Sequence, residues 1–187
     1  SHTFRDNQVV EDRVMDSNAI ERERRITILA KNTAITYKGT KINILDTPGH
    51  ADFSGEVERI MKMVDGVVLV VDSYEGTMPQ TRFVLKKAFE AHLKPIVVIN
   101  KVDKPSARPL EVIDEVLELF IDLGCDEDEL DFPVCFTSAM NNTCSLSSDV
   151  STQKEGMEPL LDMIIKYIPS PTIDYDGPLQ LQPALLD

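Results

Sequence analysis

Three short apolar runs constrain the fold of this 187-residue chain more than any other feature. They occupy residues 67–71, 96–99 and 134–137, and all three are rich in β-branched side chains. Runs that are apolar at nearly every position, rather than at every second one, are typical of strands buried on both faces of a sheet. We therefore predict a parallel sheet that other elements cover on both sides.

The segments between these runs have the spacing of amphipathic helices. Apolar residues recur every three or four positions within residues 56–64, 80–91, 110–123 and 157–168. Upstream, residues 33–37 and 41–45 are predicted to pair as a hairpin that turns at Lys38 and Gly39. Strands that alternate with helices imply right-handed crossovers, so the predicted fold class is α/β with a doubly wound, mostly parallel sheet.

Composition excludes several classes of protein. The net charge of −13 argues against direct binding of DNA or bare RNA, which usually needs a basic face. No apolar run is long enough to span a membrane, and the N-terminus has no apolar signal core. The three cysteines contain no Cys-x-x-Cys pair, which excludes a disulfide framework or a zinc site; they are Cys125, Cys135 and Cys144. We expect a cytoplasmic protein, monomeric by default.

The first motif with chemical meaning follows the predicted strand at 41–45. Asp46 at a strand end is suited to hold Mg²⁺, usually through water, where the metal bridges phosphates. Gly49 would let its backbone N–H approach a terminal phosphate, and His50 could orient an attacking water. The alternative is an ordinary Asp-Thr-Pro-Gly turn.

The second motif, Asn100-Lys101-Val102-Asp103, follows the apolar run at 96–99. Guanine presents two adjacent donors, N1–H and the exocyclic amine, and a carboxylate such as Asp103 accepts both. Adenine presents an acceptor at N1, which the same carboxylate would repel. Asn100 can bond the base edge and join neighbouring loops, while the stem of Lys101 can lie over the purine. Taken alone, this tetrapeptide also occurs by chance in loops.

Two weaker features complete the set. Ser138 and Ala139 follow the run at 134–137, and small residues there would let a backbone N–H reach the guanine O6. Thr27 precedes the first predicted strand and could ligate Mg²⁺, although a plain strand residue is the simpler interpretation. The order of these motifs, each at a strand end, makes coincidence improbable and predicts a guanine-nucleotide site.

These motifs resemble those of translational GTPases, and longer stretches resemble the TypA/BipA family. The class-level motifs are residues 23–28, 46–50, 100–103 and 138–139. The stretches that favour TypA/BipA over elongation factor G or LepA are residues 13–18, 29–35, 78–83 and 130–134. The likeness covers nearly the whole chain and is least informative at 141–156.

The resemblance implies GTP hydrolysis coupled to ribosome binding, in a P-loop NTPase-type fold. In that family pattern Thr27 and Asp46 serve Mg²⁺, and His50 serves the attacking water. The residues implied around the guanine are Asn100, Lys101, Asp103, Ser138 and Ala139. It also implies a bacterial cytoplasmic location, with a plastid as the alternative, and ribosome contacts made mostly by other domains.

One part of the pattern is absent. A phosphate-binding loop needs Gly-x-x-x-x-Gly-Lys-Ser/Thr, and no glycine in this chain is followed by lysine. In the resembling family this loop and the first strand lie just upstream of Ser1. We therefore expect a truncated GTP-binding domain, since the chain lacks an initiator Met; natural loss of the loop is the alternative. The chain itself should then bind GTP poorly, be inactive, and be marginally stable, whereas its parent hydrolyses GTP.

The expected domain layout follows from the last third of the chain. We predict the GTP-binding domain at 1–168, a Pro- and Asp-rich linker at 169–178 and the start of a β domain at 179–187. Arg25 stands where the family has glycine, and Pro183 where it has an apolar strand residue. A second functional hypothesis is a non-catalytic module with a degenerate GTPase fold that docks on the ribosome or a partner.

Overall fold

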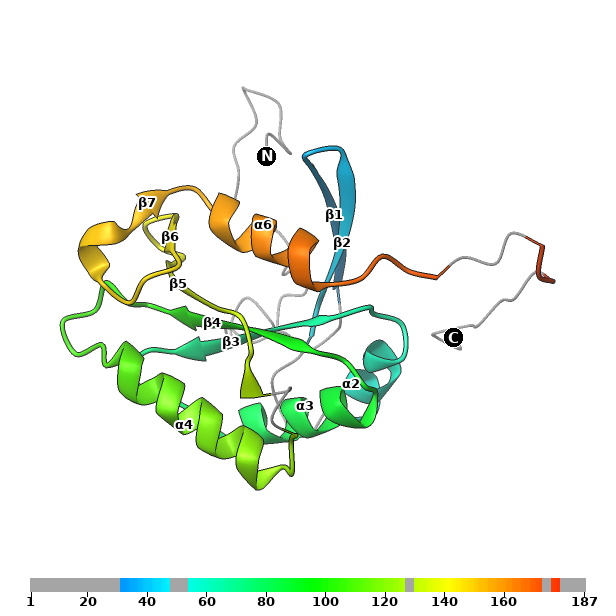
Figure 1. The fold of residues 1–187 in the computed structure, drawn as a ribbon, viewed down its shortest axis with the longest axis horizontal. Helices are drawn as coiled ribbons and strands as arrows, with labels where there is room; N and C mark the ends of the chain where they lie inside the picture. Colours follow the sequence, from blue (N-terminus) through cyan, green and yellow to red (C-terminus); the bar gives the residue numbers. More distant parts are fainter. Residues whose placement is uncertain (1–30, 48–53, 127–129, 173–175, 179–187) are drawn as a thin grey trace, which may run out of the picture.

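A computed structural model describes residues 31–47, 54–126, 130–172 and 176–178. Two sheets are present in this part of the chain (Figure 1). The smaller is an antiparallel hairpin of β1 (Lys31–Tyr37) and β2 (Thr40–Asp46), as predicted. Its turn residues Lys38 and Gly39 have φ angles of 46° and 79°, the left-handed conformation that a tight hairpin turn requires.

The larger sheet has the strand order β3-β4-β5-β6-β7. Its first three strands are parallel: β3 (Val67–Asp72), β4 (Pro95–Asn100) and β5 (Val134–Ser138). Two short antiparallel strands follow, β6 (Thr143–Ser145) and β7 (Lys154–Glu155), with a 3₁₀ turn, η2 (Val150–Thr152), between them. The predicted α/β fold with a mostly parallel sheet is confirmed.

The helices cover both faces of the parallel strands. Helices α3 (Pro79–Glu90) and α4 (Pro109–Asp122) lie on one side of the sheet, and α6 (Glu158–Tyr167) lies on the other (Figure 1). Helix α2 (Ser54–Met61) packs its Val57 and Met61 with Ala88 of α3. Within the described residues no helix is long and apolar enough to cross a bilayer.

The central strand β4 explains why the apolar runs are continuous. Val97 and Ile99 lie in the core shared with α3 and α4, whereas Ile96 and Val98 lie in the core shared with α6. All four side chains are buried, because both faces of the strand are covered. A helix on each face therefore requires an apolar residue at each position, which is the pattern that the sequence carries.

The sequence misleads in one part of the sheet. Residues 141–156 are rich in Ser, Thr and Asn, a composition that predicts an irregular polar loop, but they include β6 and β7. The backbone of β6 pairs with the edge of β5, and backbone hydrogen bonds do not depend on apolar side chains. The small side chain of Cys144 is also buried in the α6 core beside Cys135 and Met163. The polar composition of the segment concealed both contributions.

We predict that Phe120→Ala strongly destabilises the fold. Phe120 of α4 is fully buried and contacts the rings of Phe89 and Phe132, with ring centroids 5.2 and 4.5 Å away. Removing a buried aromatic ring should lower the free energy of unfolding by about 3–5 kcal/mol in urea denaturation. Ile121→Ala is the matched control, since its side chain is 56% exposed, and it should cost less than about 1 kcal/mol. Equal losses from the two variants would contradict this packing.

Candidate functional site

The carboxyl ends of the three parallel strands bring the candidate residues together. In the strand register Asp72 of β3 lies opposite Asn100 of β4, and Asn100 lies opposite Thr137 of β5. The loop after β4 therefore sits between the loops that follow β3 and β5. In an open α/β sheet this edge is the usual position of a ligand site.

Asn100 joins the end of β4 to the loop after β5. Its Oδ1 accepts hydrogen bonds from the Ala139 N–H and from the Thr137 hydroxyl, each at 3.1 Å. The backbone N–H of Val102 also donates to the Thr137 carbonyl, at 3.2 Å. Because the Ala139 N–H already donates to Asn100, a hydrogen bond from it to a base would have to be bifurcated between the two acceptors.

The backbone of Lys101 adopts an uncommon conformation. Its φ angle is 66°, in the left-handed region that few residues other than glycine occupy. The Lys101 carbonyl accepts hydrogen bonds from the Ser73 hydroxyl at 2.9 Å and from the Lys104 N–H at 3.2 Å. The neighbouring Asn100 carbonyl accepts from the Ser73 N–H at 2.8 Å. These bonds hold the loop against the strain of that conformation.

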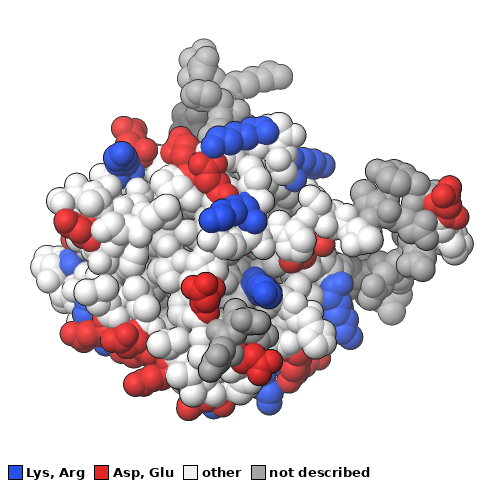
Figure 2. Space-filling view, viewed as in Figure 1, with Lys and Arg blue, Asp and Glu red and all other residues white. Residues whose placement is uncertain are grey.

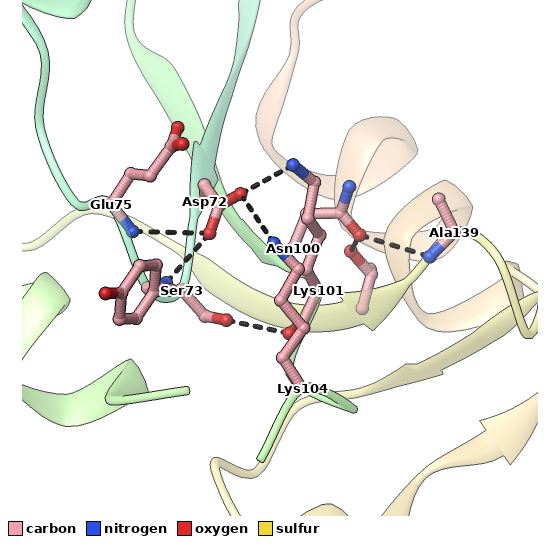
Figure 3. A network of polar contacts seen from close by, with 9 residues as sticks. Asp72, Ser73, Glu75, Asn100, Lys101, Lys104 and Ala139 are labelled. Carbon is pink, nitrogen blue, oxygen red and sulfur yellow. Dashed lines mark hydrogen bonds and ion pairs between the residues drawn. The ribbon is translucent and has the colours of Figure 1, made fainter. Parts of the chain in front are cut away.

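Asp72 is a site residue that sequence reasoning missed (Figure 3). Its Oδ1 accepts from the backbone N–H groups of Tyr74 and Glu75, at 2.8 and 3.3 Å. Its Oδ2 lies 2.5 Å from Lys101 Nζ and 3.5 Å from Lys104 Nζ. The sequence contains one indication of its role. Asp72 directly follows an apolar run, as Asp46 does.

The charge of Asp72 is strongly stabilised in the folded protein. Burial alone would raise its pKa, because the side chain is only 11% exposed. The hydrogen bonds from Lys101 and from the two backbone N–H groups outweigh burial and lower the pKa from 3.8 to about 2. The pKa of Lys101 is raised, chiefly by its hydrogen bond to Asp72 and against the effect of burial.

The remaining candidate residues at this edge differ in exposure. Asp103 and Ala139 are exposed beside Asn100, so both are accessible to a ligand. Ser138 is buried, and its Oγ accepts from the Asn141 N–H at 3.3 Å. The structure thus groups five predicted residues at one sheet edge; they are Asn100, Lys101, Asp103, Ser138 and Ala139.

The candidate magnesium and water-activating residues are only partly covered by the structure. Asp46 is the half-buried last residue of β2, opposite Lys31 of β1. Thr27, Gly49 and His50 lie outside the described residues, as do Arg25 and Pro183. Among the described residues no group of three or more His, Cys, Asp or Glu side chains is placed to hold a metal ion. A single carboxylate at a strand end fits Mg²⁺, which commonly takes one or two carboxylates together with phosphate oxygens.

Comparison with known proteins gives one matching family and several close relatives. A family model described as the elongation factor Tu GTP binding domain matches residues 1–170. The large ribosomal subunit assembly factor BipA of Bacillus subtilis is 66% identical over 99% of this chain and 30% of its own length. The BipA protein of Escherichia coli K12 is 56% identical over 100% of this chain and 30% of its own. These relatives confirm the predicted resemblance to the TypA/BipA family.

A solved structure supports the fold assignment. The crystal structure of bacterial selenocysteine-specific elongation factor EF-Sec matches with a TM-score of 0.63 and 27% identity. The match covers 81% of this chain and 24% of the other. For comparison, the chain spans about 30% of the length of the two BipA relatives named above.

We predict that Asp72→Asn destabilises the protein in a pH-dependent way. Because the folded-state pKa of Asp72 is about 2, below the ordinary 3.8, its stabilising effect is complete above about pH 5 and is lost as the pH falls towards 2. The substitution should lower the free energy of unfolding by about 2 kcal/mol at pH 7 and by progressively less below pH 4. Urea denaturation at several pH values measures this.

Asp114→Asn is the control for that experiment. It removes an exposed carboxylate from α4 and should change the free energy of unfolding by less than about 0.5 kcal/mol at pH 7. A deficit for Asp72→Asn that stays constant from pH 7 to pH 3 would show that charge on this carboxylate does not stabilise the fold.

Proposed function

The chain belongs to the elongation factor Tu GTP binding domain family, and on that premise we propose that it binds guanine nucleotide within a ribosome-associated translational GTPase. The parent protein would hydrolyse GTP to GDP and phosphate. The name of these relatives, large ribosomal subunit assembly factor, supports the ribosome as the partner. Since these relatives are bacterial, we infer the bacterial cytoplasm as the location.

The observation that carries this proposal is the meeting of three loops around Asn100. Its side chain joins the ends of β4 and β5, while the adjacent Lys101 and Asp103 remain accessible at the same edge. A guanine placed there would donate N1–H and its exocyclic amine to the Asp103 carboxylate. The aliphatic stem of Lys101 would cover one face of the purine. Adenine cannot satisfy Asp103, which gives the site its base selectivity.

The phosphate end of the nucleotide rests on the family pattern. We infer that Asp46, with Thr27, holds Mg²⁺, which when bound neutralises charge on the phosphates. Gly49 would offer its N–H to the terminal phosphate, and His50 would orient the attacking water. Asp46 at the end of β2 supports this assignment through its donor chemistry.

The surface and the match to the family model support two further assignments. On the face shown in Figure 2, described lysines and arginines are interspersed with acidic residues, which agrees with a protein that does not bind DNA directly.

The family model ends at residue 170, just after α6. We accordingly propose a GTP-binding domain at 1–168, a linker at 169–178 and a following β domain from 179.

We predict that Asp103→Asn changes the base preference from guanine to xanthine. Asparagine presents a donor and an acceptor, which suit the carbonyl and N–H of xanthine better than the two donors of guanine. Fluorescent GDP and XDP binding, with Mg²⁺, is measured on the protein expressed from its full reading frame. The wild type should prefer GDP by at least about 100-fold, and the variant should prefer XDP.

Asp131→Asn is the matched control, since Asp131 is exposed just before β5, at the opposite edge of the sheet. It should leave the preference for GDP unchanged. The same assay on this chain and on a form extended upstream by about 30 residues tests the expectation that the chain alone binds poorly. If the full-length protein binds neither nucleotide, the non-catalytic docking module replaces the GTPase proposal.

A further inference from the structure

We propose that Asp72, the last residue of β3, and Ser73, which follows it, position the guanine-recognition loop by fixing Lys101 at both its backbone and its ammonium group (Figure 3). The inference rests on the proposed function, and it assigns a role to two residues that lie outside every motif recognised in the sequence. Asp72 and Ser73 are positioning residues, because they act on the nucleotide through Lys101.

The side-chain half of this arrangement depends on how Asp72 is held. The backbone N–H groups of Tyr74 and Glu75 occupy Oδ1 at 2.8 and 3.3 Å, so the carboxylate plane is fixed. The other oxygen, Oδ2, is thereby directed at Lys101 Nζ, 2.5 Å away. Asp72 is 11% exposed, whereas the Lys101 side chain is 48% exposed. The less exposed partner, Asp72, is thus the one held in place, and the lysine extends from it towards solvent.

The backbone half depends on Ser73, which is fully buried. Its hydroxyl donates to the Lys101 carbonyl at 2.9 Å, and its N–H donates to the Asn100 carbonyl at 2.8 Å. Both bonds reach the loop from β3, whereas the bonds of Asn100 Oδ1 reach it from β5. The loop is therefore held from two sides, and the left-handed Lys101 lies at the β3 side.

The loop that carries Asp72 and Ser73 is itself anchored to α4. The Arg108 N–H donates to the Ser73 carbonyl at 2.8 Å, and Arg108 Nε donates to the Tyr74 carbonyl at 3.0 Å. The Arg108 guanidinium also pairs with Glu115 of α4. Asp72 is consequently fixed relative to the core, and it can fix Lys101 in turn.

The expected benefit is a reduced cost of binding. A lysine side chain has many rotamers, and a left-handed backbone has competing conformations, so both lose entropy when a ligand orders them. In this protein the folded structure has ordered both before any base arrives. An isolated surface ion pair contributes little, but the carboxylate of this pair is only 11% exposed and accepts two backbone hydrogen bonds, so the pairing restrains the position of the ammonium group.

A double-mutant cycle on GDP affinity tests the proposal in the protein expressed from its full reading frame. Asp72→Asn keeps an oxygen for the Tyr74 and Glu75 N–H groups but loses the charge that attracts Lys101. We expect it to raise the Kd for GDP about tenfold in the wild-type background. In a Lys101→Met background, which retains the apolar stem without the ammonium, the same change should raise the Kd less than twofold. Equal effects in the two backgrounds would overturn the proposal.

Two further variants keep the result interpretable. Lys104→Met removes the second cation near Asp72 Oδ2, 3.5 Å away, and should change the Kd less than twofold. If Lys104→Met raised the Kd as much as Asp72→Asn does, the change in affinity would come from the net charge at this edge, and the role of Lys101 would be overturned. Ser73→Ala should raise the Kd about threefold even if Asp72→Asn folds poorly, and an unchanged Kd would contradict the backbone half.

Failure of the proposed function gives a different result. If the wild-type protein binds no guanine nucleotide, or if Asp103→Asn leaves the base preference unchanged, the site is not a guanine site and this inference falls with it. If those two tests succeed while the cycle is additive, only the positioning role of Asp72 is wrong.

Discussion

Burial of β4 on both faces is the constraint on which the rest of this structure depends. Val97 and Ile99 pack towards α3 and α4, while Ile96 and Val98 pack towards α6, so neither the face nor the register of the strand can change cheaply. The register then places Asp72, Asn100 and Thr137 side by side at one edge. The polar site is thus a product of the apolar core, which brings together residues that are distant in sequence.

Two kinds of interaction then shape the edge. Neutral hydrogen bonds, accepted by Asn100 Oδ1 and donated by the Ser73 hydroxyl, set the backbone path of the recognition loop. The charged contact between Asp72 and Lys101 sets the direction of a side chain. The hydrogen bond from Lys101 lowers the pKa of Asp72 against the effect of burial, and the backbone N–H groups of Tyr74 and Glu75 lower it further while they hold the carboxylate in place. This division leaves Asp103 exposed for the ligand.

The sequence predicts the parallel strands and the loops after them because each has a local pattern of apolar runs and short motifs. Asp72 could not be found in that way, since its importance arises from pairing between β3 and β4 and from two amides of its own loop. Strand β6 could not be predicted for a related reason. Thr143 and Ser145 are polar, and the backbone of the neighbouring strand β5 supplies their hydrogen-bond partners. The shared use of the Ala139 N–H likewise depends on contacts between separate segments.

The antiparallel strand β6 also separates the candidate site at Ala139 from the connection between β6 and β7, although the two are close in sequence. Ser138 pairs with Thr143 beside the site, whereas Phe136 pairs with Ser145 farther from it, and the connection to β7 leaves from that far end. Closing a loop of greater length costs only slightly more entropy. An insertion within residues 146–151 would therefore lengthen the connection at the end of β6 away from Ala139, and it would leave the pairing of Ser138 with Thr143 unchanged.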